Sequence, residues 1–476
     1  MTPDAPRGAV VRSDIPHRLD ALEWSRWHRR VVIALGITWI LDGLEASLIA
    51  NLAPTLQDPR ALGLRAVEVG LANSVYLVGQ VIGALVFGHL TDRYGRKRLF
   101  LVTLGLYLSA TALCGLAPNL PVFLALRLLA GAGIGGEYSA INSAIDELIP
   151  ARVRGQIDLG INGSYWVGVA LGAVMTLVLL NPAVVPVHLG WRLVFGLGAA
   201  LGVAILLVRR DVPESPRWLL MHGFVREARL TMDLIESKAR GAVVKPVEVT
   251  VREVEVTVTG AVGPAYVLET LMKRFPRRTA LGVVMMTAQA FFYNAIFFSY
   301  GLILERFHRV RADRVGLYIL PFALGNFLGP VLLGPLFDRW GRRVMIPATY
   351  ALSGALLLVT GGLFYAGALT AVTQTLAWCA VFFFASAAAS SAYLTVSELF
   401  PVEVRGVAIA FFYALGTGGG AVAPSLFAHI VERGDPLRLF AGYAFAAALM
   451  LVAAVVARRL GVDSEGRSLE ELTLRD

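Results

Sequence analysis

The sequence predicts an all-α integral membrane protein, in which twelve transmembrane helices form two similar six-helix halves. Hydrophobic residues make up 56% of the 476 residues and charged residues only 16%, whereas a soluble protein carries about 25% charged residues. Apolar runs of about 20 residues, the length that crosses a bilayer, recur along the whole chain. Two charged motifs also occur once in each half of the chain. Lipid is therefore expected to surround most of this protein.

The twelve apolar runs define the expected spans. They cover residues 31–51, 69–90, 99–117, 121–145, 157–180, 190–208, 279–304, 315–336, 344–366, 370–396, 406–431 and 437–458. The first six belong to an N-terminal half at 31–208 and the last six to a C-terminal half at 279–458. A polar stretch at 209–278 separates the halves and is expected to form a cytoplasmic loop with short helices. Tails at 1–30 and 459–476 complete the chain.

One segment of the central loop has the pattern of a strand rather than of a helix. The sequence VEVTVREVEVTV at 247–258 alternates apolar and polar residues, which is typical of a half-buried β-strand. A short hairpin is one interpretation, and an extended connector is the simpler one. The pattern by itself indicates no function.

The distribution of Lys and Arg predicts how the helices are oriented in the membrane. With an even number of spans, both tails lie on one side, and the tails and loops of that side hold 33 of the 43 Lys and Arg residues. The loops of the opposite side hold nine. Positive charge collects on the cytoplasmic side of membrane proteins, so both termini of this multi-pass protein of the cell (inner or plasma) membrane are expected in the cytoplasm. The same distribution accounts for the net charge of +9 without a nucleic-acid partner.

Two charged motifs repeat between the halves. GHLTDRYGRKR at 88–98 recurs as GPLFDRWGRR at 334–343, and ELIPARVRG at 147–155 recurs as ELFPVEVRG at 398–406. In each half the first motif follows the second span and the second motif follows the fourth. Two equivalent six-helix halves are typical of secondary transporters, which bind their substrate between the halves near the middle of the membrane.

The charges of these motifs are expected to form a cytoplasmic gate. They lie at helix ends, where they can pair across helices when that side closes and separate when it opens. The alternative is that they only fix the topology. Gly95 and Gly341 are expected to allow tight turns between helices. The gate residues are Asp92, Arg93, Arg96, Glu147 and Arg154, with the copies Asp338, Arg339, Arg342, Glu398 and Arg405 in the second half.

These motifs resemble those of the major facilitator superfamily over essentially the whole chain. DRYGRKR and DRWGRR are similar to its signature loop, which occurs here in both halves. PESPRWLL at 213–220 and VDSEGRSLEEL at 462–472 resemble the sugar porters and the related metabolite:proton symporters, whereas LDGLE at 41–45 and RLLAGAGIGGEY at 127–138 look more like the aromatic-acid symporters. The resemblance implies the major facilitator fold and transport by alternating access.

Charged side chains inside the expected spans are costly and usually functional. Asp42 and Glu45 lie three residues apart on one face of the first span, and Arg127 lies in the fourth. The resemblance to proton-coupled sugar porters implies that Glu45 and Arg127 form the coupling pair. Protonation of Glu45 would release Arg127, whose planar guanidinium suits a substrate carboxylate; a static pair that only joins two helices is the alternative. Asp42 matches the first acid of the aromatic-acid symporters and is the second candidate for the proton site.

The resemblance also implies residues that contact the substrate, although each polar side chain could instead only join helices. A sugar-binding Trp of the tenth span is replaced by Tyr393, and an Asn-Trp pair of the eleventh by Gly416 and Thr417. A hexose would thereby lose a stacking partner and a hydrogen-bonding partner, which favours a carboxylated or aromatic metabolite. The further contacts that the resemblance implies are Asn162, Gln289, Asn294 and Asn326. Polar side chains within the spans add Tyr293, Tyr300 and Glu137 as candidates, and Glu137 could instead bond to neighbouring backbone.

The function expected from these observations is proton-coupled uptake, by symport, of a small polar organic solute. Its partners would be the solute, protons and the lipid bilayer, and its working unit a monomer. A sugar:proton symporter is one alternative. A drug or metabolite:proton antiporter is another, although GSYWVGVALGA at 163–173 lacks the proline that such exporters typically carry. A non-transporting receptor on the same fold would usually have longer cytoplasmic tails.

The sequence contains no recognisable feature of an enzyme or of a cofactor site. Cys114 and Cys379 both lie in apolar runs, so they predict neither a disulfide framework nor a metal site. GTGGGA at 416–421 lacks the lysine of a phosphate-binding loop and lies within an apolar span. Neither a cofactor nor a metal is expected.

Overall fold

The computed structural model describes most of the chain. The described residues are 3–180, 183–209, 213–240, 253–260, 263–297, 299–310, 312–401, 403–467 and 469. Within the helices, the side chains of Asp92 and Arg96 lie outside this description, so their part in the expected gate is not described either.

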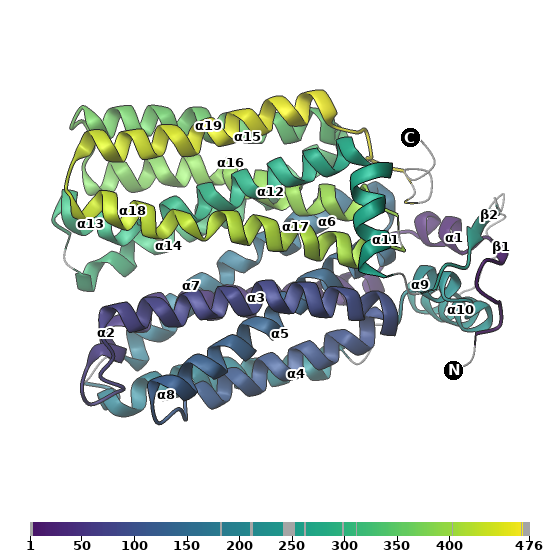
Figure 1. The fold of residues 1–476 in the computed structure, drawn as a ribbon, viewed down its shortest axis with the longest axis horizontal. Helices are drawn as coiled ribbons and strands as arrows, with labels where there is room; N and C mark the ends of the chain where they lie inside the picture. The colour runs from purple at the N-terminus through teal and green to yellow at the C-terminus, as the bar shows by residue number, and fades with distance from the viewer. Residues whose placement is uncertain are drawn as a thin grey trace.

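The protein consists of two bundles of long helices that lie side by side (Figure 1). The N-terminal bundle contains α2 (Arg26–Gln57), α3 (Ala66–Tyr94), α4 (Arg96–Cys114), α5 (Leu120–Leu148), α6 (Arg154–Gly163), α7 (Tyr165–Leu179) and α8 (Val187–Arg209). The C-terminal bundle contains α12 (Pro276–Phe297), α13 (Tyr300–His308), α14 (Ala312–Arg339), α15 (Arg342–Tyr365), α16 (Ala371–Glu398), α17 (Arg405–Gly420), α18 (Val422–Glu432) and α19 (Pro436–Leu460).

The helices account for all twelve expected spans. Among the described residues, eleven helical segments are long and apolar enough to cross a membrane. The 23-residue helix α8 occupies the position of the remaining span, at 190–208. The expected all-α membrane fold is therefore confirmed.

Three expected spans are each broken into two helices, at the junctions α6/α7, α12/α13 and α17/α18. At the first junction the hydroxyl of Ser164 donates hydrogen bonds to the main-chain carbonyls of Ile161 (2.6 Å) and Gly36 (3.0 Å). The side chain thus competes with the backbone N–H groups that bond to such carbonyls in a regular helix. Hydropathy does not register such a break, because the residues on both sides are equally apolar.

Close packing between α3 and α5 depends on glycines in both helices. A Cβ atom on Gly83 would overlap the carbonyl of Ala132, and one on Gly135 would overlap the carbonyl of Gln80. Small residues spaced four apart let membrane helices approach to backbone contact. This contact holds one polar side chain of α3, Gln80, at a fixed place between the two bundles.

A small domain covers one end of the bundles, which we call the loop end. It is built by the N-terminal tail and the central loop (Figure 1). Its elements are β1 (Val10–Ser13), α1 (Ile15–Ala21), α9 (Pro216–Met221), α10 (Val225–Arg240), β2 (Val254–Thr257), α11 (Pro264–Glu269) and the π-turn η2 (Thr270–Arg274).

The strand pattern in the central loop is satisfied by a partner far away in the sequence. Residues 247–252 lie outside the described part, but β2 pairs antiparallel with β1 of the N-terminal tail. Arg12 of β1 and Glu255 of β2 form an ion pair of 3.0 Å across the two strands. The prediction of an extended connector was therefore wrong for residues 254–257. The partner strand lies outside the loop, in the N-terminal tail.

Candidate functional site

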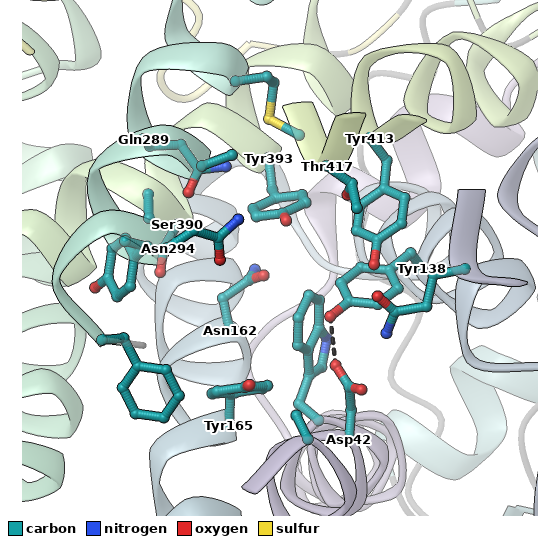
Figure 2. A pocket seen from close by; sticks show the side chains of 18 of the residues that line it. Asp42, Tyr138, Asn162, Tyr165, Gln289, Asn294, Ser390, Tyr393, Tyr413 and Thr417 are labelled. Atoms are coloured by element: carbon teal, nitrogen blue, oxygen red, sulfur yellow. Dashed lines mark hydrogen bonds between the residues drawn. The ribbon is translucent and has the colours of Figure 1, made fainter. Parts of the chain in front are cut away.

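A cavity of about 200 Å³ lies between the two bundles near the middle of the helices. Eight helices contribute side chains to it (Figure 2), and four of them, α6, α7, α12 and α17, end or begin at the helix breaks. The lining residues are Trp39, Asp42, Ala46, Asn73, Tyr76, Leu77, Gln80, Tyr138, Asn162, Tyr165, Trp166, Met286, Gln289, Ala290, Tyr293, Asn294, Phe297, Ser386, Ala389, Ser390, Tyr393, Tyr413 and Thr417.

Aromatic rings form much of the cavity wall. Tyr138 of the N-terminal bundle stacks on Tyr413 of the C-terminal bundle, with ring centroids 4.2 Å apart. Trp39 meets the edge of Tyr138 at 4.5 Å and that of Tyr393 at 5.9 Å. Such offset and edge-on pairs are the favoured arrangements of aromatic rings. The rings thus close the space between the bundles and present flat apolar surfaces to the cavity.

Asp42 is the single carboxylate among the described residues that line the cavity, and no Lys, Arg or His joins it there. The Tyr138 hydroxyl donates a hydrogen bond to one carboxylate oxygen of Asp42, drawn as a dashed line in Figure 2, and the Tyr76 hydroxyl donates to the other at 3.4 Å. The carboxylate is nearly buried, with 4% of the residue exposed. Both hydroxyls stabilise its ionised form, because they donate to it.

The expected pair of Glu45 and Arg127 is formed, but behind the cavity wall. Both side chains are fully buried and form a hydrogen-bonded ion pair. The Arg127 guanidinium lies 4.1 Å from the centroid of the Tyr76 ring. In this conformation Tyr76 therefore separates Arg127 from the cavity, and a bound substrate would not touch the arginine directly.

The expected substrate contacts divide into two groups. Asn162, Gln289, Tyr293, Asn294 and Tyr393 line the cavity. All five come from α6, α12 and α16, so both bundles contribute amides and hydroxyls to the wall. The polar part of the wall thus bridges the two halves.

The other three expected substrate contacts do not line the cavity. Asn326 is one layer behind the wall, where its side-chain oxygen accepts a hydrogen bond of 2.9 Å from Tyr293. The Tyr300 hydroxyl donates to the main chain of Tyr318 at 2.8 Å, deeper in the C-terminal bundle. Glu137 borders a separate small hollow behind Trp39. None of these three side chains reaches the cavity in this conformation.

Several lining residues were not anticipated from the sequence. Trp39, Tyr76, Tyr138, Trp166 and Tyr413 are aromatic residues within apolar runs, where a core position is the ordinary interpretation. A signal did exist for one of them, because Trp39 lies three residues before Asp42 and so shares its helix face.

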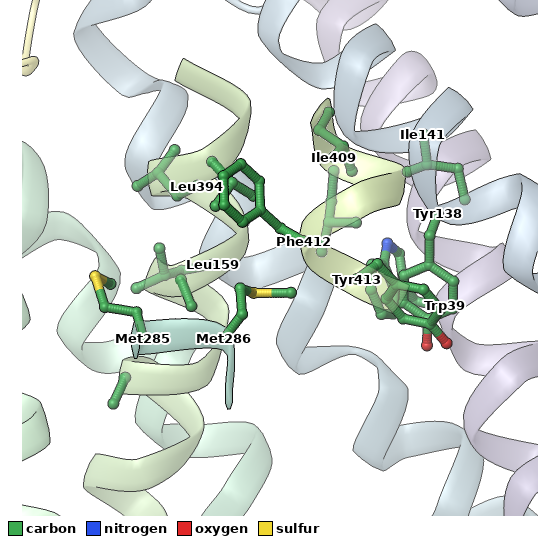
Figure 3. Close-up of a cluster of buried hydrophobic side chains, with 14 of the residues drawn as sticks. Trp39, Tyr138, Ile141, Leu159, Met285, Met286, Leu394, Ile409, Phe412 and Tyr413 are labelled. Carbon is green, nitrogen blue, oxygen red and sulfur yellow. The ribbon is translucent and has the colours of Figure 1, made fainter. Parts of the chain in front are cut away.

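An apolar layer separates the cavity from the loop end (Figure 3). Ile141, Leu159, Leu394, Ile409 and Phe412 are at most 2% exposed and pack together from both bundles. Along each helix they stand between a cavity residue and a residue of the charged motifs. The cavity is therefore closed toward the loop end.

Beyond this layer, the charged motifs meet across the two bundles. Arg154 lies 3.7 Å from Glu398, and the symmetric Arg405 lies 3.8 Å from Glu147. The backbone N–H groups of Gly155 and Gln156 donate to the Asp338 carboxylate at 3.1 and 2.7 Å. These contacts join the N-terminal to the C-terminal bundle in the closed arrangement.

A second set of charges supports these contacts from within each half. Arg342 binds Glu398 through two hydrogen bonds of 2.8 and 2.9 Å. Asp20 of α1 accepts from Arg154 (3.4 Å) and from Arg217 (2.9 Å). The N-terminal tail thus takes part in the closed loop end.

The remaining motif residues are arranged alike in the two halves. Arg93 and Arg339 are both exposed. Gly95 and Gly341 have positive φ angles of 95° and 85°, which glycine adopts readily. They turn the chain between α3 and α4 and between α14 and α15, as expected for tight turns.

One family model, described as "Sugar (and other) transporter", matches residues 45–474. Among curated proteins, the niacin transporter NiaP of Acinetobacter baylyi is 28% identical over 473 residues, covering 97% of this chain and 100% of the relative. The probable 4-methylmuconolactone transporter of Cupriavidus pinatubonensis is 28% identical, covering 80% and 79%. Myo-inositol transporter 2 of Schizosaccharomyces pombe is 26% identical, covering 92% and 81%.

Solved structures share the fold. The proton:xylose symporter XylE bound to 6-bromo-6-deoxy-D-glucose superposes with a TM-score of 0.76 at 19% identity, covering 93% of this chain and 98% of that one. A partially occluded inward-open structure of XylE from E. coli gives a TM-score of 0.63 at the same identity, covering 93% and 100%.

Proposed function

The chain belongs to the sugar (and other) transporter family of the major facilitator superfamily, and we propose that it imports a small aromatic carboxylic acid together with protons. Transport would follow alternating access, with the two bundles rocking about the central cavity. The loop end, which carries most Lys and Arg residues of the loops and tails, would face the cytoplasm.

The observation that carries this proposal is the chemistry of the cavity wall. Its surface combines flat aromatic rings with amides from Asn162, Gln289 and Asn294. The volume of about 200 Å³ is slightly larger than the ~150 Å³ that holds one benzene ring in an apolar protein cavity. A single ring with one small polar substituent fits this space. Two relatives named as niacin and 4-methylmuconolactone transporters also point to small ring compounds.

The single acid of the wall provides a reason for proton coupling. No cation lines the cavity in the described part of the chain, so a substrate carboxylate would meet the carboxylate of Asp42. Two like charges at one site repel, and protonation of one of them removes the repulsion. Binding of an acid is therefore favoured when Asp42 is protonated. Release of substrate and proton on the same side then follows from the same repulsion.

The buried pair behind Tyr76 would respond to the same event. Asp42 and the Glu45–Arg127 pair share Tyr76, through its hydroxyl on one side and its ring face on the other. Protonation of Glu45 would break the ion pair and free the guanidinium. Arg127 would then be available to a substrate carboxylate if Tyr76 turned aside.

Uptake into proteoliposomes tests this function. We expect radiolabelled nicotinate to accumulate when the outside is more acidic than the inside, and a protonophore to abolish the accumulation. Nicotinamide, which has the same ring without the acid, is the matched comparison and should compete weakly. If the gradient expels nicotinate instead, the protein is an antiporter.

A sugar:proton symporter remains a second candidate, because five amides line the cavity and could bind hydroxyl groups, those of Asn73, Gln80, Asn162, Gln289 and Asn294. D-xylose and myo-inositol in the same assay distinguish the two. Accumulation of either sugar without accumulation of nicotinate would replace the first proposal by the second.

A further inference from the structure

Asp158 is a buried acid that the proposed transport cycle does not use. It lies on α6, four residues after Arg154 of the gate and four residues before Asn162 of the cavity. The three side chains share one face of the helix, each about 6 Å from the next along its axis. Asp158 is 0% exposed, at the level of the apolar layer.

The carboxylate of Asp158 has no partner in the described part of the chain. Neither oxygen accepts a hydrogen bond, and no ion pair reaches it. The nearby Asn162 amide donates to the main-chain carbonyl of Asp158 at 2.9 Å, not to its carboxylate. Most buried polar groups in native proteins have a hydrogen-bonding partner, so a buried carboxylate without one is unusual.

The charged groups on neighbouring elements do not compensate it. On α14 and α15, Asp338 and Arg342 pair with each other at 3.1 Å, and Arg342 is held by Glu398 of α16 at 2.8 Å. On α5, Asp146 adds a further buried negative charge, and on α2 the buried titratable group near the loop end is His28, which is hydrogen-bonded to Ser25. The arginines at the start of α2, at positions 26, 29 and 30, are exposed. Each of these elements packs against α6 or bears a group that faces it. The one buried cation among these groups, Arg342, is therefore already paired with Asp338 and Glu398.

An unpaired carboxylate in such a place is stable only in its neutral form. Burying an ionised carboxylate without a partner costs far more than protonating it. While the loop end is closed, Asp158 therefore carries a proton. When the bundles part at this end, water reaches the level of the apolar layer and the ionised form becomes favourable.

We propose that Asp158 is a second proton-binding site, which takes up a cytoplasmic proton when the loop end closes and returns it to the cytoplasm when the loop end opens. The orientation of the loop end rests on the proposed function. Because the proton enters and leaves on the same side, the site does not change the number of protons transported. It makes the balance of closed and open states depend on cytoplasmic pH.

The direction of this dependence follows from linkage. The closed state binds one more proton than the open state, so acid favours closing, by up to about tenfold in the equilibrium ratio per pH unit. A transporter that brings protons into the cell would thereby be slowed by an acidic cytoplasm. Asp158 would thus limit how far the transporter acidifies the cytoplasm.

The test is a distance measurement on the purified, full-length protein in lipid nanodiscs without substrate. Spin labels on Tyr94→Cys and Trp340→Cys report the opening, because these exposed residues occupy equivalent positions within the first motif of each half. Cys114 and Cys379 are first replaced by Ala. We expect the longer, open distance to gain population as the buffer changes from acidic to mildly alkaline.

Substitution of Asp158 tests whether this residue causes the pH response. Asp158→Asn mimics the neutral form, and the labelled variant should stay largely closed with little response to pH; Asp158→Ser is the second variant should the first not fold. Asp146→Asn removes another buried acid whose carboxylate accepts no hydrogen bond among the described residues, and should retain the response. An unchanged pH response in Asp158→Asn, or its loss in Asp146→Asn alone, overturns the assignment. Because no substrate is present, this result is independent of whether nicotinate is transported.

Discussion

Tyr76 is the residue at which the two acids of α2 are connected. Its hydroxyl donates to Asp42 in the cavity, and its ring covers the guanidinium that pairs with Glu45. Cation–π contacts with buried guanidinium groups contribute about 2 kcal/mol. The side chain is 2% exposed and has little room to adopt another position without opening the site.

Tyr76→Phe separates these two contacts. The ring over Arg127 is kept and the donor to Asp42 is lost, so the ionised form of Asp42 is less favoured. We expect nicotinate binding to persist and the pH profile of uptake to move to more alkaline values. Tyr107→Phe is the matched control, since Tyr107 is also buried in the N-terminal bundle and its hydroxyl has no hydrogen bond in the described structure. Equal profiles for both variants would show that Tyr76 only fills space.

Glu45→Gln tests the buried pair. Glutamine mimics protonated Glu45 and cannot titrate, so exchange of labelled for unlabelled substrate should continue while accumulation against a gradient is lost. Arg127→Ala should be worse, because an unpaired buried charge costs about 3–5 kcal/mol. Counterflow beside gradient-driven uptake measures the difference. Continued accumulation in Glu45→Gln would leave the pair a structural role only.

The sequence was informative about charged residues and much less so about aromatic ones. Asp42, Glu45 and Arg127 could be singled out because charges are rare inside apolar spans. Trp39 and Tyr138 could not, because a ring in an apolar run looks the same whether it faces a cavity or the core. Only the packing of the two bundles decides between these positions.

At the scale of single elements, two glutamates from distant segments occupy equivalent places. Glu214 accepts from the N–H of Lys97 at 3.2 Å, at the start of α4, and Glu465 accepts from the N–H of Arg342 at 3.3 Å, at the start of α15. Carboxylates at helix N-termini bind free N–H groups and complement the helix dipole. The central loop and the C-terminal tail thus hold equivalent turns of the two halves.

The helix ends at the loop end give a prediction about gating. Arg154→Ala removes ion pairs with both Glu398 and Asp20, whereas Arg405→Ala removes one ion pair among the described residues, the 3.8 Å contact with Glu147. Both variants should favour opening toward the loop end, Arg154→Ala the more strongly.

Maleimide labelling of Ile409→Cys in the apolar layer provides the measurement, because this position is 1% exposed while the end is closed. Faster labelling is the expected result in each variant. Labelling at the parental rate in both variants would mean that these charges only determine the membrane topology and do not hold the loop end closed.

Helix positions followed from hydropathy, but helix breaks and the β1–β2 pair did not. A break such as that at Ser164 depends on side-chain bonds to backbone carbonyls, which leave the hydropathy unchanged. The strand partner of Val254–Thr257 lies more than two hundred residues away, and the pattern of a single strand does not identify its partner.

At the scale of the whole molecule, the cavity is bounded by side chains from both bundles, so its size limits the substrate. We expect nicotinate to inhibit uptake of its labelled form and quinoline-3-carboxylate, which has a second fused ring, to do so far more weakly. Competition in proteoliposomes measures this. Equal inhibition by the two acids would contradict a cavity built for one ring.

The two halves differ in the charged side chains that they place beside the cavity. The offset of 251 residues between their second motifs aligns Arg127 with Trp378, which is likewise fully buried. The charges beside the cavity, those of Asp42, Glu45 and Arg127, thus all belong to one half. If both acids are ionised in the empty carrier, the three groups sum to −1, and each charge that crosses 100 mV changes in energy by about 2.3 kcal/mol. With both acids protonated and an anionic substrate bound, the sum is zero. The membrane voltage would then act on the return of the empty carrier and leave the loaded step untouched.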